Sequence, residues 1–467
     1  MKGGGRSLLE IPEKSASTSN GHVVRSFVAR LLLNKLAEQS QGYCILTGYE
    51  GLPDDFDSDI DFMVGEEDFR RVPEWIAFIA QESNTTLFQV IPHEVSARAF
   101  RLAMLHESEL TLIQPDSCFD YRHFGRLWFR AEDVLRDRRM HDRGFWIPSA
   151  RHEFVYYLIK RLNKQDFRQE HGARLSRLYA EDPENCTALL RRFWTMPTVE
   201  GIAKMAQSGD WQSLMTNLPM YRQEMLRHSS GSVGEKAITR WKNLQHDMER
   251  ILFPTGGWIA FIGPDGCGKS SVIEAIVREF APAFQKIERF HLRPGLFPGH
   301  TKPGSAVTDP HGKPARSLLM SVAKMAYLAS DYWLGWILRV RPAMMRTRLV
   351  VFDRYFYDIL VDPKRVRYGG PKWFLSLLLK VLPEPELVVL LDAPPEVLWS
   401  RKQEVPFEEV VRQQESYRAF SKTCNRVVVV DAAQPLRTVV QQTAQALLTH
   451  FSCRTYARLK LGKEENR

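Results

Sequence analysis

Residues 258–280, WIAFIGPDGCGKSSVIEAIVREF, decide the fold of the C-terminal part of this chain. The uninterrupted apolar run at 258–262 is typical of a strand that is buried on both faces of a parallel sheet. The octet from Gly263 to Ser270 matches G-x-x-x-x-G-K-S, the pattern of a loop that wraps around phosphate groups, and the segment after it has the apolar spacing of a helix. A strand, this loop and a helix in direct succession predict a phosphate-binding α/β domain.

The residues of the octet have distinct chemical tasks in phosphate binding. Glycines let backbone N–H groups point at the phosphates, and the start of the helix adds positive potential. The Lys269 ammonium can reach the β and γ phosphates, and the Ser270 hydroxyl can ligate magnesium, so we expect ATP and Mg2+ as cofactors. The alternative is a glycine-rich strand-to-helix turn without a ligand. The loop residues expected to bind the cofactor are Gly263, Gly266, Gly268, Lys269, Ser270 and Ser271.

Further apolar runs downstream predict the rest of a sheet. They are LVVF at 349–352, LVVLL at 387–391 and VVVV at 427–430, with a weaker candidate at 287–291. Helical segments separate these runs, which is the pattern of a doubly wound, parallel, five-stranded α/β sheet. Ligands of such sheets bind beyond the carboxyl ends of the strands, where the phosphate loop also lies.

A charged pair follows the run at 349–352. Asp353 and Arg354 deliver a carboxylate and a guanidinium to the same sheet edge as the loop. Asp353 can position the metal or the acceptor, and Arg354 can bind a phosphate through two parallel N–H groups. The alternative is a surface ion pair without a catalytic task. We predict that Lys269, Asp353 and Arg354 are catalytic.

These motifs resemble the thymidylate kinase family, in which a phosphate loop, a DR[YF] motif and lid arginines occur in the same order. The resemblance covers about residues 258–448 and includes LLDAPPEVLWSR at 390–401. It implies that Asp265 contacts the acceptor sugar and that Arg293 corresponds to the family's arginine before Pro-Gly. It also implies that Arg401 lies in the lid and is catalytic, because it would stabilise charge on the phosphoryl group in transfer.

The chain departs from this family in several places. SDYW at 330–333 stands where the family has an arginine after Ala-Asp, on the helix that reads the thymine base. Residues 298–316 and DILVDPKRVRYGG at 358–370 also differ from the family pattern. We therefore leave the acceptor open between thymidine monophosphate and a sugar or other compound. Lys402 and Arg412 are further lid candidates, with a solvated helix face as the alternative.

The N-terminal part carries a different acidic motif. Asp59 and Asp61 alternate in an apolar run, and a strand would place both carboxylates on one face, where they suit magnesium. With the turn at 46–48, the motif resembles the nucleotidyltransferase superfamily, which implies a third metal-binding carboxylate on a later strand. Asp116 is the candidate and Asp120 the runner-up. The alternatives are an acidic exposed turn and an inactive remnant of that fold.

Composition narrows the function classes further. The length of 467 residues suggests two or three units, and the net charge of +9 without a basic run suits a protein that binds small anions instead of nucleic acid. The cysteines lie far apart, which disfavours disulfide and zinc frameworks. The apolar stretch at 318–340 contains Lys324 and Asp331, so we expect a buried helix and no transmembrane segment, with peripheral membrane contact as the alternative.

The composition of successive segments predicts how the chain is divided into domains. We expect a disordered lead-in at 1–22, a nucleotidyltransferase-like domain at 23–148, a helical extension and linker at 149–250, a thymidylate kinase-like domain at 251–452 and a basic tail at 453–467. The lead-in lacks the apolar core of a secretory signal, so we expect a cytoplasmic protein. A homodimer is left open.

The leading functional hypothesis is an ATP- and magnesium-dependent kinase of the nucleoside monophosphate type that phosphorylates a small phosphorylated acceptor. One alternative is a sugar or glycan kinase and nucleotidyltransferase pair in polysaccharide synthesis, which the changed base-reading helix favours. The other is a nucleotide-binding regulator without turnover, against which Lys269, Asp353 and Arg354 argue.

Overall fold

The computed structural model describes residues 20–57, 59–106, 109–123, 126–228, 244, 248–297, 314–403 and 405–461. Several of the sequence predictions concern residues outside these ranges. The lead-in up to residue 19, the linker at 229–236, the stretch at 298–313 and the tail beyond 461 lie outside the described residues.

Internal contacts divide the chain into two compact units. The first consists of Met1–Asn84, Pro92–Phe100 and Ile113–Asp247. The second consists of Thr85–Ile91, Arg101–Leu112 and Met248–Arg467. The predicted phosphate loop and the N-terminal acidic motif therefore belong to different units.

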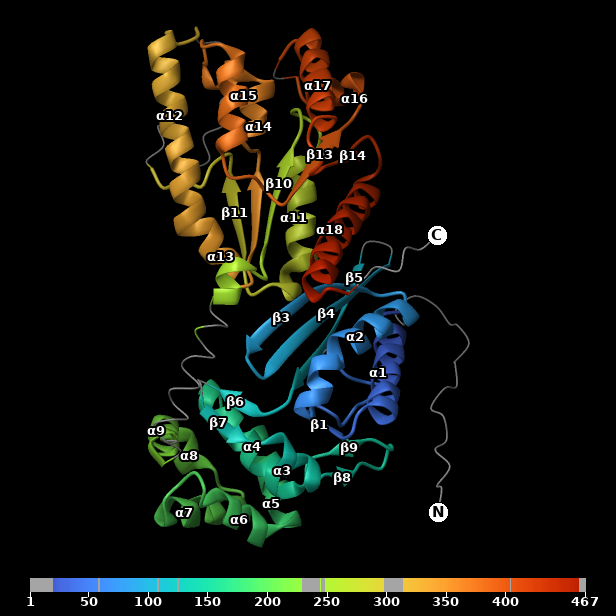
Figure 1. The fold of residues 1–467 in the computed structure, drawn as a ribbon, viewed down its shortest axis with the longest axis vertical. Coiled ribbons are helices and arrows are strands. Elements are labelled where there is room, and N and C mark those ends of the chain that lie inside the picture. The colour runs from blue at the N-terminus through green and yellow to red at the C-terminus, as the bar shows by residue number, and fades with distance from the viewer. Residues whose placement is uncertain are drawn as a thin grey trace. The chain divides into compact units, whose positions relative to one another are not determined.

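The N-terminal carboxylate motif lies in a mixed sheet with strand order β1-β2-β5-β4-β3 (Figure 1). β1 pairs antiparallel with β2, and β2 pairs parallel with β5. Four of the five strands coincide with the β-like runs YCILTG, DIDFMV, TLFQVI and LTLIQ of the sequence, whereas β4 does not. The helices and strands between residues 20 and 147 are α1 (Asn20–Gln39), β1 (Tyr43–Thr47), β2 (Asp59–Val64), α2 (Glu66–Glu82), β3 (Thr86–Glu94), β4 (Ala97–His106), β5 (Glu109–Cys118), β6 (Tyr121–His123), β7 (Arg126–Phe129), α3 (Ala131–Arg136), β8 (Arg139–Met140) and β9 (Trp146–Ile147).

The segment after β9 is helical. Its α4 is buried along most of its length and shares one apolar core with β1, β2 and the later helices. Trp128 and Trp194 are among the largest fully buried side chains of this core. The helices are α4 (Ala150–Lys164), α5 (Gln169–Glu181), α6 (Pro183–Leu190), α7 (Met196–Ser208), α8 (Gln212–Thr216) and α9 (Leu218–His228).

The C-terminal sheet has five strands in the order β11-β12-β10-β13-β14, and its neighbouring strands all pair in parallel. The predicted doubly wound five-stranded sheet is confirmed. Its elements are β10 (Gly257–Ile262), α11 (Lys269–Phe280), η1 (Ala281–Ala283), β11 (Ile287–His291), α12 (Leu318–Gly335), η2 (Trp336–Val340), α13 (Arg341–Met345), β12 (Leu349–Asp353), α14 (Phe356–Val361), η3 (Pro363–Val366), α15 (Lys372–Val381), β13 (Leu387–Asp392), α16 (Pro395–Arg401), α17 (Phe407–Ser421), β14 (Val427–Asp431) and α18 (Leu436–Leu459).

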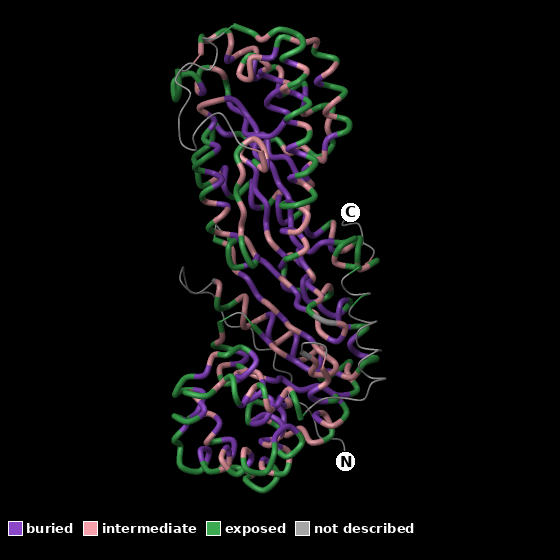
Figure 2. The backbone as a smooth tube through the Cα atoms, turned by 90° about the vertical axis from the view of Figure 1, so that its left-hand side faces the viewer, coloured by how far each residue is buried: buried purple, intermediate pink, exposed green. Residues whose placement is uncertain are grey.

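The central strand β10 explains why these apolar runs form a buried sheet. Every residue of β10 is buried, and Figure 2 shows buried backbone through the middle of this sheet. The side chains of β10 alternate between two cores. Ile259 and Phe261 pack with α11 and α18, whereas Trp258, Ala260 and Ile262 pack with α12, α14, α15 and α17. Helices thus cover both faces, and the loops at the carboxyl ends of the strands remain for ligands.

The apolar stretch at 318–340 forms α12 followed by the π-helical turn η2. The predicted helix is present, but only one of its faces is buried. Met325 is 0% exposed, whereas Leu319 is 79% and Leu338 is 62% exposed. Apolar residues lie on both faces of this helix, so composition alone overstated its burial. Within the described residues, no helix is long and apolar enough to cross a membrane.

Candidate active site

The phosphate loop connects β10 to α11. Gly263 has a φ of 143° and Gly266 a φ of 85°, which residues with side chains rarely adopt. A Cβ at Gly263 would meet the Leu391 carbonyl oxygen at 2.5 Å, and one at Gly266 would meet that of Leu398 at 2.6 Å. The fold of the loop therefore requires glycine at both positions.

Lys269 begins α11, and its ammonium turns back over the loop. The residue is 8% exposed, and Nζ donates to the carbonyl oxygens of Gly263 at 2.8 Å and Pro264 at 2.9 Å. Its charge contributes to lowering the pKa values of Asp265 and Asp353, so it lies near both carboxylates. A cation therefore stands at the centre of the loop, where the transfer of a phosphoryl group requires one.

The residues around Lys269 form the start of the helix. Gly268 is the N-cap with a φ of 83°, and Ser270 and Ser271 are exposed in the first turn of α11. Backbone N–H groups of a first helical turn have no intrahelical partner and attract anions. The predicted cofactor contacts of these residues stay predictions.

Asp265 in the loop holds two arginines that are distant in sequence. Its carboxylate forms ion pairs with Arg354, directly after β12, and with Arg365 of η3, whose Nη1 lies 2.9 Å from Oδ2. Burial alone would raise the pKa of the Asp265 carboxyl, but the neighbouring cations, Arg354 above all, hold that pKa well below its usual value. Asp265 is therefore ionised, and its predicted contact with an acceptor sugar stays a prediction.

Arg354 points into the protein. Its φ is 70°, and its N–H donates to the Phe261 carbonyl oxygen at 2.9 Å. The guanidinium contacts Asp265 and, at 3.0 Å, the buried Asp358, which also accepts the Tyr417 hydroxyl at 2.7 Å. The Arg354 guanidinium, which we predicted to bind a phosphate, thus pairs with two carboxylates of the chain itself, Asp265 and Asp358. These ion pairs link the loop to the end of β12. The phosphate contact of Arg354 stays a prediction.

Asp353 ends β12 beside the phosphate loop. Parallel pairing sets it opposite Phe261 of β10 and His291 of β11, and His291 Nδ1 lies 3.5 Å from Asp353 Oδ2. Burial alone would raise the pKa of the Asp353 carboxyl, but the hydrogen bond from His291 and the charge of Lys269 hold that pKa below its usual value. The carboxylate is therefore available as an anion at neutral pH.

The second oxygen of Asp353 suits a cation. Oδ1 is buried, and the described residues give it no hydrogen-bond partner. Kinases hold Mg2+ through one or two oxygen side chains together with nucleotide phosphates, so Asp353 and the Ser270 hydroxyl fit this metal. Across the described residues, no group of three or more His, Cys, Asp or Glu side chains is arranged to hold a metal ion by itself.

Arg293 follows β11 through a tight bend. Leu292 has a φ of 62°, and its N–H donates to the Asp353 carbonyl oxygen at 2.9 Å, which fixes the bend to β12. Arg293 Nη1 lies 3.1 Å from Asp331 Oδ2, and the guanidinium faces the Tyr327 ring at 5.7 Å. The predicted phosphate-side arginine therefore lies at the same sheet edge as Asp353.

Asp331 and Tyr332 occupy the part of α12 where the sequence departs from the pattern of the thymidylate kinase family that it resembles. Asp331 is 0% exposed and also accepts backbone N–H groups from residues 295–297. Tyr332 is 1% exposed, donates its hydroxyl to the Leu292 carbonyl oxygen and packs edge-on against Tyr355. Tyr332 is thus a core residue, and α12 offers no arginine at this position to read a base.

The lid candidates lie at the end of α16 and on α17. Arg401 ends α16, is exposed, and donates to the carbonyl oxygen of the residue after β14 at 2.9 Å. The end of α16 lies beside the loop, because a Cβ at Gly266 would meet Lys402 Cβ at 3.3 Å. Arg412 lies on α17 in an ion pair with Glu409 at 2.6 Å. The catalytic role of Arg401 stays a prediction.

Three charged or titratable residues at this edge were missed by the sequence analysis. They are His291, Arg365 and Asp392. Asp392 ends β13 and accepts from Arg418 Nε at 2.7 Å, and its buried Oδ1 has no hydrogen-bond partner among the described residues. The sequence feature that could have identified Asp392 is its position directly after the apolar run at 387–391. Arg365 had no comparable signal, because it meets Asp265 across 100 residues of sequence.

The N-terminal carboxylates come together on neighbouring strands. Asp59 and Asp61 lie on β2, and parallel pairing sets Asp61 opposite Asp116 of β5. Asp61 Oδ2 accepts from Lys160 Nζ of α4 at 2.7 Å and from Thr47 Oγ1 at 2.9 Å. An ammonium thus already balances the charge of Asp61, and metal binding by the three carboxylates stays a prediction.

The runner-up Asp120 has structural partners. Its Oδ1 accepts the Ala131 N–H at 3.0 Å at the start of α3, and Arg122 lies 3.1 Å from its Oδ2. The residue after the predicted glycine turn, Tyr49, is buried and donates its hydroxyl to Glu153 at 2.6 Å. The choice between Asp116 and Asp120 as the third carboxylate stays a prediction.

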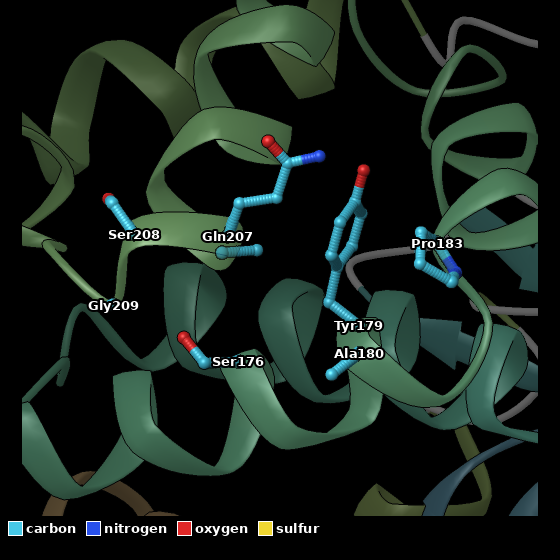
Figure 3. Close-up of a pocket in the computed structure, with 8 residues that line it drawn as sticks. Ser176, Tyr179, Ala180, Pro183, Gln207, Ser208 and Gly209 are labelled. Atoms are coloured by element: carbon cyan, nitrogen blue, oxygen red, sulfur yellow. The ribbon is translucent and has the colours of Figure 1, made fainter.

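A hollow of about 390 Å³ lies between α5, α6 and α7 (Figure 3). Its lining has neither a charged side chain nor a nucleophile placed beside a base, and Tyr179 shares its hydroxyl with Thr187 at 2.8 Å. We assign no chemistry to it. The lining residues are Ser176, Tyr179, Ala180, Pro183, Ala206, Gln207, Ser208 and Gly209.

Comparisons with known proteins agree with the geometry of the C-terminal unit. The thymidylate kinase family model matches residues 261–443. The thymidylate kinase of Leuconostoc mesenteroides is 26% identical over 212 residues, which cover 40% of this chain and 92% of that enzyme. The enzyme of Lactobacillus acidophilus is 26% identical over 211 residues, with coverages of 41% and 94%.

A solved thymidylate kinase structure from Ehrlichia chaffeensis is 12% identical, with a TM-score of 0.30, and covers 41% of this chain and 98% of its own. The support therefore comes from the sequence matches and from the parallel sheet with its phosphate loop. The C-terminal part of this chain contains a thymidylate kinase-like domain.

Proposed function

We propose that the C-terminal domain transfers the γ-phosphoryl group of ATP to a phosphate oxygen of a small phosphorylated acceptor. The bond between the γ-phosphorus and the bridging oxygen of ADP breaks, and a bond between that phosphorus and the acceptor oxygen forms. The observation that carries this proposal is the position of Lys269 within the phosphate loop, near both Asp265 and Asp353.

Each residue of the site has a task in this proposal. Lys269 neutralises charge on the β and γ phosphates, and the first turn of α11 donates N–H groups to them. Asp353 and Ser270 would hold magnesium together with the nucleotide, and the ion would neutralise charge on the phosphates. Arg354 keeps Asp265 and the loop in register with β12 through the ion pairs described above. Arg293 faces the acceptor phosphate as a cation.

The experiment is transfer of label from γ-labelled ATP with nucleoside monophosphates and sugar phosphates as acceptors. Asp353→Asn keeps the side-chain volume but removes the anion, so transfer should fall by roughly 10² or more. The matched control is Asp431→Asn, which removes an exposed carboxylate at the end of β14. Equal transfer by both variants would sink the assignment of Asp353.

A second activity is proposed for the N-terminal domain. We propose that Asp59, Asp61 and Asp116 hold a divalent cation in a nucleotidyltransferase-like site, and the pairing of Asp61 with Asp116 on parallel strands supports this. Such a cation would compete with the Lys160 ammonium for Asp61. A sugar or glycan kinase and nucleotidyltransferase pair would combine the two sites.

A further inference from the structure

A group of cations surrounds the first turns of α12, apart from the phosphate loop. Lys324 Nζ donates to the Val366 carbonyl oxygen at 2.8 Å, which joins α12 to the last residue of η3. In the same region, the Arg316 N–H donates to the Arg367 carbonyl oxygen at 3.0 Å, and Arg367 Nε donates to Pro314 at 2.9 Å. Three segments that each carry a cationic residue are thus held together, and the charges of Arg316 and Arg367 both act on Lys324. We call these residues the α12 cluster: Arg316, Lys324 and Arg367.

Packing between the segments makes this arrangement specific. Ser321 of α12 accepts the Gly369 N–H at 2.9 Å and donates to the Arg316 carbonyl oxygen at 3.4 Å. A Cβ at Gly369 would meet that same carbonyl oxygen at 2.2 Å, so this close approach of the two backbones requires glycine. The α12 cluster is therefore built by backbone and side-chain contacts.

The α12 cluster carries positive charge that the described residues do not neutralise. Lys324 and Arg367 donate only to backbone carbonyl oxygens, and the described residues provide no carboxylate partner for Arg316, Lys324 or Arg367. Burial, followed by the charges of Arg316, Arg367 and Arg293, lowers the pKa of Lys324 to about 8. Like charges held together without a counter-ion favour an anionic ligand.

The cluster lies on the same side of α12 as the acceptor arginine. Lys324, Tyr327 and Asp331 are spaced by three and four residues and so share one helix face. Arg293 contacts Tyr327 and Asp331 on this face. Seven residues of helix span about 10 Å, so Arg293 and Lys324 define two cationic positions within roughly that distance.

We propose that the acceptor carries two separate anionic groups, one bound by Arg293 beside the phosphate loop and the other bound by the α12 cluster. The inference rests on the proposed phosphoryl transfer and names the class of its acceptor: a bisphosphate, or a phosphate with a second acidic group. A nucleoside monophosphate with a neutral base leaves the α12 cluster without a partner. A nucleotide and a sugar can both supply the two groups.

The test uses simple probes that carry either one or two phosphonate groups on an alkane chain. Ethylphosphonate and alkane-α,ω-bisphosphonates with three to six carbons are titrated into the full-length protein by calorimetry at pH 7. We expect one bisphosphonate length to bind at least about 10-fold more tightly than ethylphosphonate, because its second group reaches the α12 cluster. Lys324→Met and Arg316→Gln should each reduce this ratio to less than about 3-fold.

Two controls separate the possible outcomes. Lys286→Met removes an exposed cation directly before β11, at the opposite end of the strand from His291, and should leave the ratio unchanged. Titration of ATP with Mg2+ into the same samples reports the kinase site independently. Equal affinities for mono- and bisphosphonates, or an unchanged ratio in Lys324→Met, would overturn the two-anion acceptor even if ATP binds. Failure to bind ATP would contradict the proposed kinase, while the phosphonate ratio still decides this inference.

Discussion

Arg293 Nη1 lies 3.1 Å from Oδ2 of Asp331, a carboxylate that is 0% exposed and also accepts the backbone N–H groups of residues 295–297. One buried anion on α12 thus fixes both the acceptor arginine and the backbone that follows it. Asp331 is therefore a positioning residue in the proposed reaction, because it acts through Arg293 and not on the phosphoryl group.

Replacing Asp331 with asparagine should weaken acceptor binding selectively. The change keeps the side-chain shape but leaves Arg293 without its counter-ion, and losing one partner of such a pair costs on the order of 2 kcal/mol, about 30-fold in kcat/KM. We expect the loss in the acceptor KM, with the ATP KM unchanged. Steady-state kinetics of Asp331→Asn beside Asp431→Asn measure this. Equal rises in both KM values would mean that Asp331 only stabilises the fold.

The acceptor site should discriminate poorly among nucleobases. Tyr332 is buried in the core where the resembled family has a base-reading arginine, so α12 lacks the donor that would reject the wrong base. We expect kcat/KM values for the monophosphates of thymidine, deoxyuridine and deoxycytidine to agree within about 10-fold. A preference for thymidine monophosphate of about 10³-fold or more would show that another side chain reads the base.

Binding of a two-anion ligand should weaken above pH 8. The pKa of Lys324 is lowered to about 8, so its ammonium is present below that pH and is lost above it. A phosphonate group becomes more negative as the pH rises, so a decline in affinity above about pH 8 reports the loss of a cation of the protein. Calorimetry of the best bisphosphonate across pH 7–9.5 measures the decline. Lys324→Arg should abolish it, since arginine stays charged; the same decline in that variant would exclude Lys324 as its source.

The N-terminal carboxylates should bind a divalent cation. Two ionised carboxylates on one strand face repel each other, and a cation between them relieves the repulsion. When Mn2+ is titrated into nucleotide-free full-length protein, the Asp59→Asn, Asp61→Asn double variant should bind one Mn2+ ion fewer than the wild type. Lys160→Met should tighten the binding of that ion, because the ammonium 2.7 Å from Asp61 competes with the metal.

The control for that titration is the double variant Asp55→Asn, Asp57→Asn. It removes the same charge from exposed positions in the same acidic stretch and should leave binding intact. Identical isotherms for wild type and the Asp59, Asp61 variant would mean that the motif is an acidic strand end without a metal, and the N-terminal activity would have to be abandoned.

Local sequence was sufficient to predict the C-terminal sheet and its loop. β10 is apolar at every position because helices cover both of its faces, and the other strands follow the same rule. The loop could be predicted because its glycines and Lys269 act within eight consecutive residues. Asp353 was found for a similar reason, since it follows a strand that ends at the sheet edge.

Features that depend on tertiary contacts could not be predicted in the same way. β4, ARAFRLAMLH, is rich in residues that favour helices, and its place in the sheet overrides that preference. The ion pairs of Asp61 with Lys160 and of Asp265 with Arg365 join residues 99 and 100 positions apart. No periodicity or spacing within one segment indicates such partners.

The most direct test of the central claim is acceptor-dependent transfer of label from γ-labelled ATP by wild type, Lys269→Ala and Lys286→Met. Removing the Lys269 ammonium should lower transfer by about 10²-fold or more, because nothing then neutralises the β and γ phosphates in the loop. Thermal unfolding monitored by circular dichroism verifies that each variant is folded. The account predicts labelled product from wild type and Lys286→Met and a loss of about 10²-fold or more in folded Lys269→Ala. Transfer at the wild-type rate in Lys269→Ala, or no transfer by wild type to any phosphorylated acceptor, would contradict it.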